Sequence, residues 1–146
     1  MSILTLPEDT LRLLIRIAFL IGAITDGLAV LPLLSPRLAA SLFGGDSSRA
    51  QSPQAHYALR IAAALMAGWT ILLFWGAIEP FQRRDLLWIT VFPVVAGILA
   101  ATYSAVRTGM VSRRRMTPLW LHLSSVSVFY LALFILTVRA HASHAP

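Results

Sequence analysis

Four long apolar stretches, separated by short polar segments, make up most of the chain. They cover residues 11–34, 55–77, 86–106 and 119–138. Each has the length of about 20 residues at which an α-helix crosses a hydrocarbon core of ~30 Å. The pattern therefore predicts an all-α membrane protein. We expect a four-transmembrane-helix bundle that forms a single membrane domain over residues 1–146, with both ends of the chain on one side of the membrane.

Prolines and capping residues predict where the helices begin and bend. Ser52-Pro53 precedes the second apolar stretch and Thr117-Pro118 precedes the fourth, and both pairs are typical helix starts. A further short helix is expected over residues 36–43, where its leucines and phenylalanine suit a segment lying along the membrane surface. Pro93 lies inside the third stretch, where the missing N–H is expected to kink the helix.

The composition agrees with an apolar environment. Hydrophobic residues make up 58% of the chain and charged residues only 12%, against about 25% charged residues in a soluble domain. So few charges do not cover a surface that faces water. The chain also contains no cysteine, which excludes disulfides, thiolate metal sites and cysteine nucleophiles.

The positive charges indicate how the chain meets the lipid. The net charge is +6, and all twelve basic residues are arginines, mostly at helix ends and in loops. There they are expected to contact anionic lipid headgroups, and no motif indicates nucleic acid as a partner. Six arginines fall on the side of loops one and three and four on the opposite side. The positive-inside rule then predicts a multi-pass protein of a prokaryotic cytoplasmic membrane, with loops one and three in the cytoplasm.

Several ionisable residues fall within or close to the apolar stretches, which is costly in lipid and needs a partner or a water-filled space. Asp26 lies eight residues before the end of the first stretch, and Arg60 lies five residues into the second. We expect these two side chains to form an ion pair at similar depth. Arg16 and Glu79 form a second candidate pair near the opposite interface.

The Asp26–Arg60 pair lies in a half of the membrane that contains other polar residues. His56 precedes Arg60 by one helical turn, while Tyr103 and His122 lie near loop three. One hypothesis is a binding or proton-handling pocket made by Asp26, His56, Arg60, Tyr103 and His122. The alternative is a structural ion pair, with interfacial histidines and a tyrosine that never converge. No catalytic motif, metal-ligand spacing or cofactor motif is present, so no cofactor is predicted, although His56 and His122 remain candidates for haem axial ligands.

Small residues recur at helical spacing in two of the stretches. Ala64 and Gly68 lie four residues apart, as do Gly97, Ala101 and Ala105. Such spacing lets helices approach closely in lipid. We expect these faces to pack within one bundle, while a homo-oligomer or a membrane partner protein remains open.

Two sequence segments resemble a known group of proteins. One runs from Tyr57-Ala58-Leu59-Arg60 through Gly68-Trp69-Thr70 to Glu79-Pro80-Phe81-Gln82-Arg83-Arg84. The other contains Thr90-Val91-Phe92-Pro93-Val94-Val95-Ala96-Gly97 and, later, Arg115-Met116-Thr117-Pro118-Leu119-Trp120. Over roughly the last 90 residues they are similar to small prokaryotic four-helix membrane proteins that carry no assigned activity. The resemblance implies the fold and supplies no mechanism.

Three hypotheses for the function follow. The first is a non-enzymatic structural or interaction bundle. The second is an oligomeric small-solute or proton-coupled transporter that uses a polar pocket around Asp26 and Arg60. The third is a membrane enzyme or haem protein that uses His56 and His122.

Overall fold

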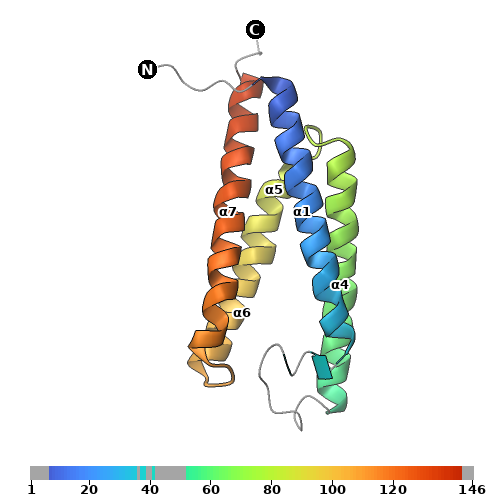
Figure 1. Ribbon diagram of the computed structural model, residues 1–146, viewed down its shortest axis with the longest axis vertical. Coiled ribbons are helices and arrows are strands. Elements are labelled where there is room, and N and C mark those ends of the chain that lie inside the picture. Colours follow the sequence, from blue (N-terminus) through green and yellow to red (C-terminus); the bar gives the residue numbers. More distant parts are fainter. Residues whose placement is uncertain (1–6, 36, 39–40, 42–51, 143–146) are drawn as a thin grey trace.

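The computed structural model describes residues 7–35, 37–38, 41 and 52–142, and the side chains up to residue 140. Within this part of the chain the protein is all-α, and its helices run alternately up and down as a four-helix bundle (Figure 1). The elements are α1 (Glu8–Leu34), α4 (Pro53–Ile78), α5 (Asp85–Ile89), the π-helical segment η1 (Thr90–Val95), α6 (Ala96–Arg107) and α7 (Arg113–Ala142).

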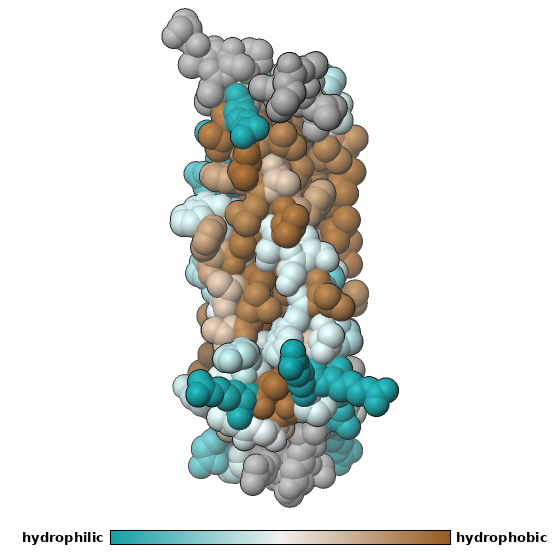
Figure 2. All heavy atoms as spheres, turned by 90° about the vertical axis from the view of Figure 1, so that its left-hand side faces the viewer, coloured by the Kyte–Doolittle hydropathy of each residue, from teal (hydrophilic) through white to brown (hydrophobic). Residues whose placement is uncertain are grey.

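All four helices are long and apolar enough to span a membrane, where α5, η1 and α6 count as one span of residues 85–107. Helix α1 begins at the end of the bundle where α7 ends, as an even number of spans requires (Figure 1). Figure 2 shows apolar side chains covering the length of one face, with hydrophilic side chains gathered towards its two ends. These features describe a multi-pass membrane protein whose apolar helices contact lipid.

The starts of the second and fourth helices differ in how well the sequence predicts them. Ser52 caps α4 as predicted, because its side chain accepts a hydrogen bond of 3.2 Å from the backbone N–H of Ala55. The predicted cap at Thr117 is wrong: α7 begins earlier, at Arg113, and the Thr117 hydroxyl donates to the Arg113 carbonyl at 3.0 Å. Three arginines therefore form the first turn of α7, since arginine is a good helix former even where hydropathy is low.

Pro93 lies inside the π-helical segment η1, between the α-helical segments α5 and α6. Proline has no N–H to donate to the carbonyl four residues earlier, and its ring clashes with that carbonyl in a regular α-helix. A π-helical turn changes the hydrogen-bond register and makes room for the ring. The third span thus accommodates Pro93 without being interrupted.

The bundle consists of two antiparallel helix pairs that meet mainly in one half. Helix α1 packs most extensively against α4, and α7 packs against α5, η1 and α6. The shared core lies towards the end that carries the start of α1 and the end of α7. Its largest members are Leu11, Ile15, Phe19, Leu73, Leu87, Tyr130 and Leu133. Helix α6, in the other half, has no buried residue.

Only some of the small residues serve this packing. Gly22 and Gly76 have no room for a side chain, because a Cβ atom would lie within 3.2 Å of Leu73 and of Phe19, respectively. A Cβ atom on Gly68 or Gly97 would meet nothing within 4 Å. The expectation that these two glycines pack within the bundle is wrong, because both lie on outward faces. The helix predicted over residues 36–43 lies largely outside the described residues.

Candidate functional site

Asp26 lies on the face of α1 that is directed towards the interior of the bundle. The buried residues of α1 include Leu11, Ile15, Phe19 and Ala23, and Asp26 follows them at helical spacing. Its side chain is half-buried. Among the described residues it forms no ion pair within 4.0 Å and no hydrogen bond. A single carboxyl group in this position is costly in an apolar environment unless another polar group stabilises it.

The packing of α1 against α4 determines the depth of Asp26. Cβ atoms placed on Gly22 and Gly27 would lie 3.2 Å from Leu73 Cδ1 and 3.4 Å from Thr70 Cγ2. Asp26 is adjacent to Gly27, so it lies about level with Thr70. Arg60 precedes Thr70 by ten residues in α4. At a rise of ~1.5 Å per residue, it lies roughly 15 Å from the level of Asp26, towards the start of the helix.

The predicted ion pair between Asp26 and Arg60 is therefore not formed. Counting residues from the end of each apolar stretch gives equal depths only if both helices end at the same level. In the structure α4 extends well beyond the end of α1 towards loop one (Figure 1). Equal distances from the two helix ends are then not equal depths in the bundle.

Two polar residues of α7 lie within electrostatic range of Asp26: His122, which is exposed, and Tyr130, which is buried. Asp26 interacts electrostatically with His122 and with Tyr130. Tyr130 is buried, and its hydroxyl donates a hydrogen bond of 2.9 Å to the carbonyl of Ala18 on α1. We call Asp26, His122 and Tyr130 the α1–α7 polar cluster. Such a set of a carboxyl group, an imidazole and a phenol contains groups that can donate and accept protons.

Sequence reasoning placed Asp26 and His122 in one pocket but missed Tyr130. The signal for Tyr130 is its hydroxyl, which lies near the middle of an apolar stretch and needs a hydrogen-bond acceptor when buried. A small residue on a neighbouring helix was the second signal. A Cβ atom on Gly22 would lie 2.3 Å from the Tyr130 hydroxyl oxygen, so only glycine leaves space for it.

The other three predicted site residues lie apart from this cluster. His56 is in the first turn of α4, where its Nδ1 lies 3.1 Å from the Ser52 carbonyl oxygen. Arg60 is exposed, one turn further on. Tyr103 is 61% exposed on the outer side of α6.

The position of His56 also bears on the haem hypothesis. By the packing of α1 against α4, His56 is fourteen residues, or roughly 21 Å, from the level of Asp26 at ~1.5 Å per residue. His122 interacts with Asp26, so it lies near that level. The two imidazoles therefore do not face each other across a single iron. Among the described residues, no three histidine or carboxylate side chains are grouped closely enough to hold a metal ion.

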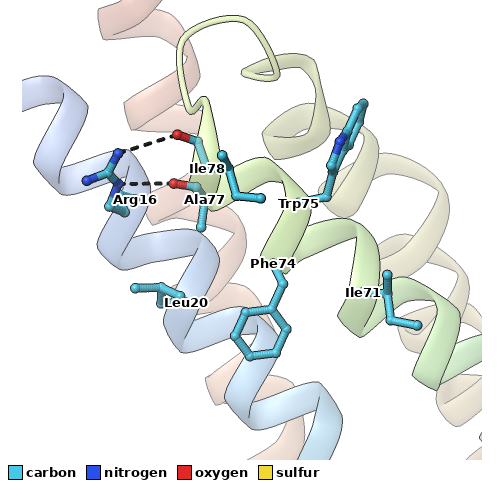
Figure 3. A pocket seen from close by; sticks show the side chains of 7 residues that line it. All are labelled: Arg16, Leu20, Ile71, Phe74, Trp75, Ala77 and Ile78. Atoms are coloured by element: carbon cyan, nitrogen blue, oxygen red, sulfur yellow. Dashed lines mark hydrogen bonds between the residues drawn. The ribbon is translucent and has the colours of Figure 1, made fainter.

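A second polar arrangement lies where α4 ends. Arg16 of α1 donates from Nε to the Ala77 carbonyl at 3.0 Å and from Nη2 to the Ile78 carbonyl at 3.4 Å (Figure 3). These carbonyls have no partner within the helix, and they carry the negative end of its dipole. The predicted pairing of Arg16 with Glu79 is wrong, because Glu79 pairs with Arg83 at 2.9 Å.

Arg83 completes this arrangement from the loop that follows α4. Its guanidinium group lies 3.7 Å from the centre of the Trp75 ring and donates to the Trp75 carbonyl. Two arginines from different parts of the chain thus cover the carbonyl end of α4. An open groove of about 500 Å³ lies beside Arg16, and it is lined by Arg16 and Leu20 of α1 and mainly by outward-facing side chains of α4 (Figure 3).

Comparisons of the chain with protein-family models, with curated proteins and with solved structures give no match.

Proposed function

We propose that the protein is a non-enzymatic interaction bundle of a prokaryotic cytoplasmic membrane, which associates with a second copy of itself through α6. The observation that carries the proposal is that α6 has no buried residue within the chain. Its exposed positions are mostly small, namely Ala96, Gly97, Ala100, Ala101 and Ser104. Small side chains contribute little contact with lipid but let two helix backbones approach closely.

The exposed face of α4 differs from that of α6, and this difference supports α6 as the dimer surface. Around Gly68 the α4 face presents large aliphatic side chains, and Leu65 and Ile71 are 70% and 67% exposed. Such a surface is well solvated by lipid tails, so lipid is expected to cover it. Apart from Tyr103, which is 61% exposed, the α6 face lacks large apolar side chains, which favours a protein partner there.

Glycine substitutions separate these two surfaces. Gly97→Leu on α6 is expected to raise the dissociation constant of the dimer in lipid nanodiscs or mild detergent by about tenfold or more, because a loss of ~1.4 kcal/mol corresponds to tenfold in that constant. Neither Gly97 nor Gly68 has a neighbour that a Cβ atom would meet, so Gly68→Leu is the matched control. Single-molecule photobleaching measures both dimer fractions. A wild-type monomer, or an equal loss in the two variants, would contradict the proposal.

The proposed orientation places loops one and three in the cytoplasm and both termini outside. Six arginines on the side of loops one and three, against four on the opposite side, support it. Three of the six are exposed in the first turn of α7. The prokaryotic setting rests on the resemblance of spans two to four. A cysteine at Ser112 should be labelled only from the cytoplasm and one at Gln82 only from outside. The reverse labelling would overturn the orientation.

The α1–α7 polar cluster favours one alternative, a proton-coupled transporter. Proton relays of membrane transporters use acids and histidines, and here an acid directed towards the bundle interior lies within electrostatic range of an imidazole. In this alternative Asp26 and His122 take the role that the sequence hypothesis gave to Asp26 and Arg60. Four helices enclose little space, so a dimer is expected to be required for a pathway.

Proton flux in liposomes tests this alternative. If the polar cluster conducts, Asp26→Asn should lower the rate of flux driven by a pH gradient at least about tenfold, since the site loses its ionisable acid. Arg60→Gln should leave the rate unchanged, because Arg60 lies outside the cluster. Wild-type liposomes no leakier to protons than empty ones would dispose of the transporter.

A further inference from the structure

The groove beside Arg16 combines apolar walls with one positive group. Four aliphatic or aromatic side chains from α1 and α4 form much of its lining: Leu20, Ile71, Phe74 and Ile78. Arg16 lies at the end of the groove next to the last turn of α4 (Figure 3). The groove therefore has an apolar length and a cationic end.

Among the described residues, no acid pairs with Arg16. Its Nε and Nη2 atoms donate to two backbone carbonyls, which are dipoles rather than full charges, and its Nη1 atom makes no hydrogen bond among the described residues. Glu79, the carboxylate that follows α4, is already held by Arg83. The Arg16 side chain is exposed as well, so its free nitrogen is accessible to an anion.

The size of the groove limits what fits in it. A volume of about 500 Å³ lies in the range of small-molecule sites, which is ~300–1,000 Å³. Three turns of a transmembrane helix, at ~10 Å diameter and ~5.4 Å per turn, occupy roughly 1,300 Å³, so a whole helix does not enter the groove. A flexible chain suits the groove better than a packed helix does.

We propose that this groove is a binding site for one phospholipid with an anionic headgroup. An acyl chain lies along Leu20, Phe74 and Ile71, and a phosphate oxygen accepts a hydrogen bond from Nη1 of Arg16. Arginine binds phosphate strongly because the bond is charge-assisted. This site is separate from α6 and from the α1–α7 polar cluster.

Trp75 lines the groove and reports on its occupant. The probe is a variant in which Trp69, Trp88 and Trp120 are phenylalanine, reconstituted into phosphatidylcholine vesicles with increasing brominated phosphatidylglycerol. Bromine quenches tryptophan fluorescence on contact, so the quenching curve gives the relative affinity of the two lipids at Trp75. We expect phosphatidylglycerol to bind about fivefold more tightly than phosphatidylcholine, as one arginine contributes ~1 kcal/mol.

Three variants decide the proposal. Arg16→Gln should remove the preference for phosphatidylglycerol. The control is Arg139→Gln, which should leave the preference unchanged, because Arg139 is exposed near the end of α7, at the same end of the bundle as Arg16. Leu20→Phe narrows the groove without touching the hydrogen bonds of Arg16, and should lower the preference even if Arg16→Gln does not fold. An unchanged preference in Leu20→Phe, or an equal loss in Arg16→Gln and Arg139→Gln, would show a general surface attraction and overturn the site.

Discussion

Gly22→Ala is expected to destabilise the protein by about 1–3 kcal/mol, the usual cost of forcing an extra group into a packed interior. The new methyl group would lie 2.3 Å from the Tyr130 hydroxyl oxygen and 3.2 Å from Leu73. Tyr130 would have to move, and its hydrogen bond to the Ala18 carbonyl would be lost. Because the site joins α1, α4 and α7, one methyl group disturbs three helices at once.

Two further variants make this prediction specific. Gly27→Ala on the same helix places its methyl group at an ordinary distance of 3.4 Å from Thr70, and should be neutral or stabilising by up to about 1 kcal/mol, since alanine favours the helix. Adding Tyr130→Phe to Gly22→Ala removes the clashing oxygen and should recover part of the loss. Steric-trapping measurements of unfolding in bicelles give the three free energies. Equal effects of Gly22→Ala and Gly27→Ala would refute this packing.

Phe19→Ala is the second large effect, with an expected loss of roughly 2 kcal/mol. Phe19 has no exposed surface, and its ring fills the space left open by Gly76. In lipid the unfolded helix keeps its side chain in an apolar medium, so transfer from water contributes little. The remaining contribution to the loss of stability is the cost of the cavity, which is ~24 cal/mol per Å³ for a void of roughly 100 Å³.

Phe74→Ala is the matched control for Phe19→Ala. Phe74 is 47% exposed and lines the open groove beside Arg16, where lipid tails can fill the space that the ring leaves. Its replacement should cost less than about 0.5 kcal/mol, as is usual for surface positions. The same unfolding assay applies. A larger loss from Phe74→Ala than from Phe19→Ala would mean that the core lies on another face of the bundle.

The sequence predicts the fold well because hydropathy and helix length alone determine which segments cross a membrane. The Ser52 cap and the four apolar helices follow from it directly. The first turn of α7 was missed because Arg113 and its neighbours are polar, although arginine favours a helix. Hydropathy identifies the apolar core of a span and not the polar turns that extend it into the headgroup region.

The candidate site was less predictable because it depends on the relative depth of helices. The α1–α4 register is determined by Gly22 against Leu73 and by Gly76 against Phe19, contacts that a pattern of apolar residues does not contain. This register separates Asp26 from Arg60. It leaves His122 as a partner within electrostatic range, and it reveals Tyr130 as a neighbour that the sequence pattern did not indicate.

Disulfide trapping tests this register most directly, because the natural chain has no cysteine. Cysteines at Gly27 and Thr70 should cross-link readily under mild oxidation in native membranes. A Cβ atom on Gly27 would lie 3.4 Å from Cγ2 and 3.9 Å from Oγ1 of Thr70, and a cysteine at Thr70 carries its sulfur at one of these γ positions. Cysteines at Asp26 and Arg60, roughly 15 Å apart along the helices, should not cross-link. Efficient cross-linking of the second pair and none of the first would contradict the account.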